Sequence, residues 1–188
     1  MQNNYAMNQC TTPMQLQVQN TLRLLWLEHV LWTKSFLVST AFGLNDLEYV
    51  TNRLLRNPID FANILRPLYG NQTAEEFQKL LTEHLLIAAR LVNAAKAGDR
   101  TMAQEQRVKW YTNADDIAEF LSDINPNWDA KTWQAMLYEH LKMTEEEALQ
   151  LLNGQYAASI TQYDAIEQQA LKMADEMVRG VIKQFQIR

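Results

Sequence analysis

All three histidines of this 188-residue chain directly follow a glutamate, and the pairs recur at nearly constant intervals. The interval from His29 to His84 differs by a single position from the interval between His84 and His140. A glycine follows each histidine at one constant offset, at Gly43, Gly98 and Gly154. Two helices of about 25 residues joined by a turn occupy the length of one such interval. The spacing therefore predicts an internal repeat of three helical hairpins of about 55 residues, each with a glycine in its turn.

The first two predicted hairpins share a second signature, Asn-x-x-Asp, on their returning helix. Asn57 precedes Asp60 in this motif, and Asn113 precedes Asp116. Because an α-helix rises by about 1.5 Å per residue, equal lengths out to the turn and back bring the histidine and this motif to one level. In the third hairpin Gln168 and Gln169 stand at the corresponding positions and no such Asp follows, so the partner of His140 is left open.

The composition favours helices throughout. The chain has only 5 glycines and 4 prolines, and strand-like alternation of apolar residues is absent. We predict an all-α fold, a compact bundle of about six helices in a single domain over residues 16–188, preceded by a flexible tail over residues 1–15. A bend or break is expected at Pro58. The expected helices cover about 15–41, 46–69, 73–97, 99–122, 131–152 and 155–185.

Net charge, cysteine content and hydrophobicity restrict the binding partners and the cellular location that we expect. The net charge is −5 without a basic stripe, which argues against nucleic acid as a partner. Cys10 is the only cysteine, so the chain cannot form an intramolecular disulfide or a cysteine-based zinc site. No apolar stretch reaches the length of a membrane-spanning helix. We therefore expect a cytoplasmic protein that does not bind membranes, and the oligomeric state is left open.

The repeated histidines are the main candidates for chemistry. Apolar residues three and four positions away place each imidazole on an inward helix face, and imidazole with carboxylate is a common ligand set for transition metals in helical bundles. The leading hypothesis is a metal-binding bundle, with Fe, Mn or Zn expected first, acting as an oxidoreductase or metal-assisted enzyme if a coordination position stays open. The predicted ligands and supporting residues are His29, His84, His140, Asp60, Asp116, Glu28, Glu83 and Glu139.

Two alternatives are compatible with the same residues. Each buried histidine could bond to Asn or Asp across its own hairpin without metal, in a non-catalytic bundle that binds a partner or a small molecule. The Glu-His groups could instead serve as acid and base in an enzyme with an organic substrate. Six aromatic residues near the motifs could line a small-molecule pocket or belong to the core. They are Trp26, Trp32, Trp110, Tyr111, Trp133 and Tyr138.

Four segments, 27–32, 54–61, 81–85 and 136–141, resemble those of a bacterial all-helical family of unknown function, over about residues 20–185. Some members of that family carry an acetylglutamate kinase label. That activity needs an α/β sheet and glycine-rich phosphate loops, which this sequence lacks. The helix-borne Glu-His pairs are also distantly similar to those of hemerythrin-like and ferritin-like metal bundles, and three histidines from separate helices resemble the metal-dependent thiol-transferase bundles, although neither spacing is reproduced. These resemblances imply an all-α fold and favour a bound metal.

Overall fold

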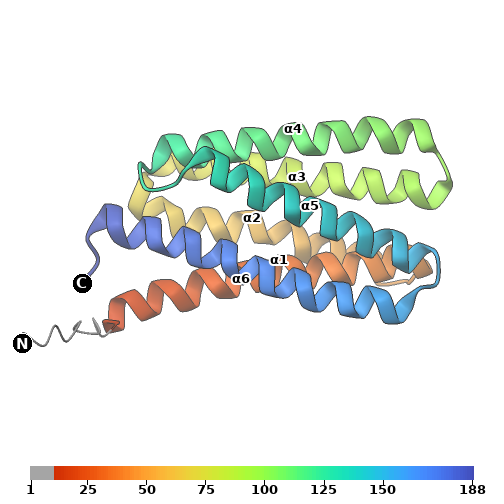
Figure 1. Cartoon of the computed structure of the whole chain (residues 1–188), viewed down its shortest axis with the longest axis horizontal. Helices are drawn as coiled ribbons and strands as arrows, with labels where there is room; N and C mark the ends of the chain where they lie inside the picture. The colour runs from red at the N-terminus through yellow and green to blue at the C-terminus, as the bar shows by residue number, and fades with distance from the viewer. Residues whose placement is uncertain (1–10) are drawn as a thin grey trace, which may run out of the picture.

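The computed structural model describes residues 11–188, which form six α-helices and no strand (Figure 1). This confirms the all-α prediction, and the predicted helix ends agree to within two residues. Cys10 and most of the predicted tail lie outside the described residues, and the first helix begins at residue 13. The helices are α1 Pro13–Phe42, α2 Leu47–Tyr69, α3 Asn71–Ala97, α4 Arg100–Ile124, α5 Ala130–Leu152 and α6 Tyr156–Phe185.

The three glycines predicted to form turns do so in one geometry. Gly43, Gly98 and Gly154 have φ of 64°, 73° and 73°, the left-handed conformation that glycine adopts at lowest cost. The amide after each glycine donates to the carbonyl oxygen five residues earlier, at 3.0, 3.0 and 2.8 Å. This pattern ends α1, α3 and α5 in the same manner. All three turns lie at the end of the bundle opposite the C-terminus (Figure 1).

Helix α2 continues through Pro58 and Pro67 without a break. A proline in a helix removes one backbone hydrogen bond. Here Leu54 and Phe61, on either side of Pro58, are both buried. Packing of this apolar face offsets the lost bond, because tertiary contacts supply most of a helix's stability.

Consecutive helices are neighbours, and α1 also packs against α6, which closes the bundle. Most buried side chains form one large core cluster that includes Trp26, Phe77 and Trp133. A second cluster near the glycine turns contains Phe36, Val92 and other apolar residues. Among residues 11–188, no helix has both the length and the apolar character needed to cross a membrane.

One glycine lies inside a helix rather than in a turn. Gly180 of α6 faces the indole of Trp128, which belongs to the connection between α4 and α5. A Cβ at position 180 would lie 1.9 Å from Trp128 Nε1. That nitrogen donates to the carbonyl oxygen of Glu176 at 3.2 Å, so the indole lies directly on the backbone of α6. Because glycine has no side chain, the connection between α4 and α5 can pack directly on α6 at Gly180 and cover the core.

We expect Gly180→Ala to destabilise the protein by about 1–3 kcal/mol through overpacking against Trp128, despite the higher helix propensity of alanine. The free energy of unfolding from urea denaturation measures this change. Thr161→Ala, at an exposed position of the same helix, is the control and should change stability by no more than about 0.5 kcal/mol. A stability of Gly180→Ala equal to that of the wild type would contradict the close contact with Trp128.

Candidate functional site

The three histidines meet in the interior of the bundle. His29 on α1, His84 on α3 and His140 on α5 are each 2% exposed. The ring centroid of His29 lies 6.4 Å from that of His84 and 5.7 Å from that of His140. The three rings line a closed cavity of about 10 Å³, together with Trp26, Phe77, Leu81, Ile117, Leu121, Trp133 and Leu137. The convergence follows from placing each histidine at the same distance from its glycine turn.

An asparagine on the returning helix holds each of the first two imidazoles. Nδ1 of His29 lies 3.0 Å from Oδ1 of Asn57, and Nδ1 of His84 lies 2.8 Å from Oδ1 of Asn113. Each asparagine donates its Nδ2 to the backbone carbonyl four residues before the histidine, at 3.0 and 3.1 Å. Because the amide nitrogen donates to that carbonyl, the amide oxygen faces the imidazole, and Nδ1 must carry the hydrogen.

Gln169 takes the asparagine's place beside His140. Its Nε2 donates at 2.8 Å to the carbonyl oxygen of Met136, again four residues before the histidine. The longer side chain does not complete the pair, since Nδ1 of His140 and Oε1 of Gln169 both lack a hydrogen-bond partner. The residue of the returning helix at this level is therefore an amide rather than a carboxylate, and it bonds to the backbone before His140 but not to the imidazole.

Burial keeps the three imidazoles uncharged. It lowers the pKa of His29, and burial together with repulsion from His29 lowers the pKa of His84 to about 3. The pKa of His140 lies well below its usual value, first because of burial and then because of repulsion from the other two rings. His84 is also fixed at its second nitrogen, where Nε2 accepts a hydrogen bond from Nε1 of Trp110 at 3.2 Å.

The predicted carboxylates lie elsewhere. Glu28 pairs with Arg53 at 2.9 Å and Asp60 pairs with Arg56 at 3.0 Å, while the other three, Glu83, Glu139 and Asp116, are exposed. A glutamate next to a histidine is turned about 100° round the helix, so it points away when the imidazole points inward. Over residues 11–188 there is no group of three or more His, Cys, Asp or Glu arranged to hold a metal ion. Of the predicted ligand set, only the histidines come together.

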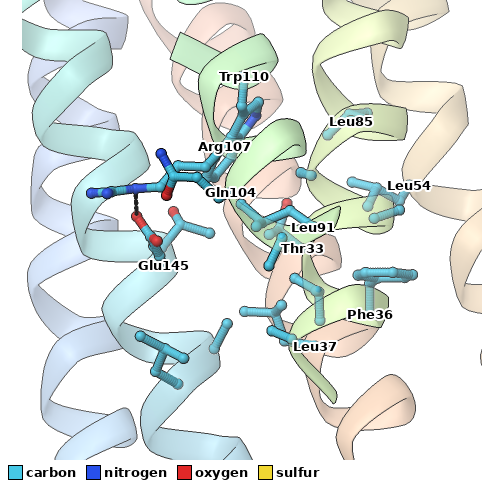
Figure 2. A pocket seen from close by; sticks show the side chains of 18 of the residues that line it. Thr33, Phe36, Leu37, Leu54, Leu85, Leu91, Gln104, Arg107, Trp110 and Glu145 are labelled. Carbon is cyan, nitrogen blue, oxygen red and sulfur yellow. Dashed lines mark hydrogen bonds and ion pairs between the residues drawn. The ribbon is translucent and has the colours of Figure 1, made fainter. Parts of the chain in front are cut away.

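Figure 2 shows the lining of a larger cavity, which the sequence did not predict. In the chain, its lining residues fall between the histidine or asparagine and the glycine turn of each hairpin. Its volume is about 230 Å³, and all helices except α6 contribute to its walls. The apolar part of its lining consists of Phe36, Leu37, Leu54, Leu85, Ala88, Ala89, Leu91, Val92, Ala95, Ala103, Trp110, Ala148 and Leu149. Of the six aromatic residues proposed for a pocket, only Trp110 lines this cavity, whereas Trp26 and Trp133 line the histidine cavity.

Polar side chains from α1, α4 and α5 complete the lining of this cavity. The hydroxyls of Thr33 and Thr144 donate to the carbonyl oxygens of His29 and His140, at 2.7 and 2.9 Å, so these threonines offer the cavity no free hydroxyl hydrogen. The remaining polar lining comes from Arg100, Gln104, Arg107 and Glu145. Figure 2 shows the ion pair between Arg107 and Glu145, whose Nε–Oε2 distance is 3.0 Å. The cavity thus has apolar walls and one charged rim.

One side-chain hydrogen bond links the walls of the two cavities. The indole of Trp110 lines the larger cavity, and its N–H donates to His84 of the histidine cluster. The wall of the larger cavity is therefore anchored to the buried imidazoles.

Comparison of the chain with protein-family models, curated proteins and solved structures gives no match. The family resemblance stays a prediction, and the function has to be argued from the geometry of the two cavities.

We expect acid to destabilise the protein through the buried histidines. Their pKa values are lowered by folding, so below pH 6.5 the unfolded chain binds protons that the folded chain does not. Stability should therefore fall as the pH drops from about 6.5 toward the folded pKa, about 3 for His84. A histidine contributes about 1.4 kcal/mol per pH unit between its unfolded and its folded pKa, which for His84 spans about pH 6.5 to 3.

Urea denaturation between about pH 6 and pH 4.5 measures this slope. In His84→Gln the slope should be smaller by about 1.4 kcal/mol per pH unit. Glu83→Gln, which removes the exposed neighbouring charge, serves as the control and should leave the slope nearly unchanged. An unchanged slope in His84→Gln would show that this imidazole is not held neutral in the folded protein.

Proposed function

We propose that this chain is a ligand-binding helical bundle that holds a small, largely apolar molecule in the cavity beside Trp110. The observation that carries the proposal is the apolar cavity of about 230 Å³ with a single charged rim. An apolar protein cavity of about 150 Å³ is large enough to bind benzene. By proportion, this cavity has room for about nine non-hydrogen atoms.

The way the cavity is built also supports this function. Its walls come from helices packed on one another, which favours a site formed before the ligand binds. Alanines at positions 88, 89, 103 and 148 lie on three different helices and leave the space open. Larger apolar side chains at these positions would fill the space and gain packing energy. A site for a ligand accounts for the small residues.

We expect 1-octanol, a neutral apolar probe, to bind this cavity and to shift the amide signals of the lining residues in ¹H–¹⁵N correlation spectra. Ala89→Phe should weaken binding by about tenfold or more, because the added ring occupies the space of the probe. Ala157→Phe, at an exposed position outside the cavity, is the matched control and should bind normally.

If Ala89→Phe does not fold, Ala103→Leu, at a lining position on α4, replaces it. Shifts scattered over the surface, or equal binding by a folded cavity-filling variant and the control, would contradict a ligand site in this cavity.

We also propose that the six helices are three copies of one hairpin, as the sequence spacing predicts. Three shared features support duplication: the inward histidine, the left-handed glycine at a constant offset after it, and the amide that donates to the carbonyl four residues before the histidine. In this reading, the amide and the histidine define how the two helices of a hairpin align, and neither is required for catalysis.

Metal binding by His29, His84 and His140 is the second candidate function. It is favoured by the convergence of three neutral imidazoles, two of them held through Nδ1 by an amide, as metal-binding histidines are commonly held by a neighbouring group. Fe, Mn and Zn are the ions that we propose. An ion at His84 Nε2 would have to replace the hydrogen bond from Trp110.

Elemental analysis of untagged protein, purified without chelators and loaded separately with Fe, Mn and Zn, tests this candidate. Metal binding predicts about one equivalent of one ion, lost in a folded variant with His29, His84 and His140 all changed to Ala. Changing Glu28, Glu83 and Glu139 to Gln should leave the metal in place, because these side chains lie outside the cluster. Absence of metal under every loading condition would reject this candidate and leave the ligand-binding proposal intact.

A further inference from the structure

The rim of the larger cavity carries an excess of positive charge. Its charged side chains are Arg100, Arg107 and Glu145. Arg107 pairs with Glu145, whereas Arg100 takes part in none of the ion pairs formed within residues 11–188. The rim therefore has a local charge of about +1 on a chain whose net charge is −5. A negatively charged head group would be attracted to this rim.

Arg107 stands at the border between the apolar space and solvent. It lines the larger cavity and also a neighbouring open depression that includes Tyr111, Asp115 and Tyr138. Its guanidinium lies 5.6 Å from the ring centroid of Tyr111, a contact that restrains the side chain. With 45% of the Arg107 side chain exposed, an anion bound here would keep part of its hydration and avoid the full cost of burying a charge.

We infer that the ligand is an apolar monocarboxylate of about eight carbons, with its chain in the cavity and its carboxylate at Arg100 and Arg107. This inference rests on the proposed ligand-binding function. Guanidinium groups suit carboxylates because they donate paired hydrogen bonds in one plane. Octanoate would place seven alkyl carbons in the cavity, within the room for about nine non-hydrogen atoms that the volume provides. A cationic head would meet two guanidinium groups, and a second negative charge would approach Glu145.

Isothermal titration calorimetry with octanoate, 1-octanol and octylamine at pH 7.5 tests the inference. Each of the three probes contains eight carbons, and they differ in the charge of the head group. In octanoate the eighth carbon belongs to the carboxylate. We expect octanoate to bind about fivefold or more tightly than 1-octanol, because its carboxylate gains a charge-assisted hydrogen bond at the rim. Octylamine should bind most weakly.

Variants of the rim separate the role of each charge. Arg100→Gln and Arg107→Gln should each weaken octanoate binding about fivefold while leaving 1-octanol binding unchanged. Glu145→Gln should strengthen octanoate binding, because it removes the carboxylate that competes for Arg107. Lys109→Gln removes an exposed positive charge from the same helix, outside the cavity, and should have little effect on either ligand.

The outcomes of these experiments distinguish the carboxylate assignment from the proposal that the cavity binds a ligand. If neither octanoate nor 1-octanol binds, the ligand-binding proposal itself is wrong. Equal affinity for both would retain the cavity as a ligand site and overturn the carboxylate assignment. The assignment would also be overturned if the arginine variants left octanoate binding unchanged, or if Lys109→Gln weakened it as much as they do.

Discussion

The bundle interior depends on a bridge that joins the two helices of each hairpin through one side-chain amide. The amide nitrogen donates to a backbone carbonyl of the outgoing helix, and in the first two hairpins the amide oxygen faces the imidazole one turn further on. A buried polar group without a partner costs about 1–3 kcal/mol. A helix that slid along its neighbour would lose the amide-to-backbone bond in every pair, and in the first two pairs also the bond to the imidazole. The bridge therefore makes one alignment of each hairpin much more stable than the others.

Burial among aromatic and aliphatic side chains explains the chemical state of the histidines, because it lowers the pKa of all three. The asparagine bonds give the Nδ1 hydrogens of His29 and His84 an acceptor, so these two rings stay neutral without an unpaired N–H. A charged ring would face both an apolar environment and two neighbouring imidazoles. This combination allows a bundle core to contain three titratable groups without a carboxylate beside them.

Helix positions and the meeting of the histidines could be predicted from the sequence, because both follow from residue spacing along a regular helix. The acidic partners could not. Asp60 and Asp116 were favoured over Asn57 and Asn113 because carboxylates are common metal ligands, but a three-residue step along a helix turns the side chain by about 60° and moves it out of the core. Gln168 and Gln169 both stand at the position of the asparagine, and spacing alone does not show that Gln169 makes the asparagine's backbone contact with a longer side chain.

The cavity beside Trp110 was beyond prediction for a different reason. Its walls combine alanines and leucines that are far apart in the chain, and each of them looks like an ordinary core residue until the helices are placed together. The contact between Gly180 and Trp128 joins a connecting segment to a distant helix in the same way. Features made from several helices depend on how side chains from separate helices face one another, and spacing within one helix carries little information about that.

The hydrogen bond between Trp110 and His84 has a consequence for how the protein could change during evolution. Trp110 forms part of the cavity wall, and His84 holds the indole in place from the core side. Exchanging this tryptophan for a smaller residue would deepen the cavity and also leave the imidazole without its donor. Adaptation to larger molecules is therefore easier at the leucines of the wall, such as Leu85 and Leu91, where a shorter side chain enlarges the cavity without removing a side-chain hydrogen bond.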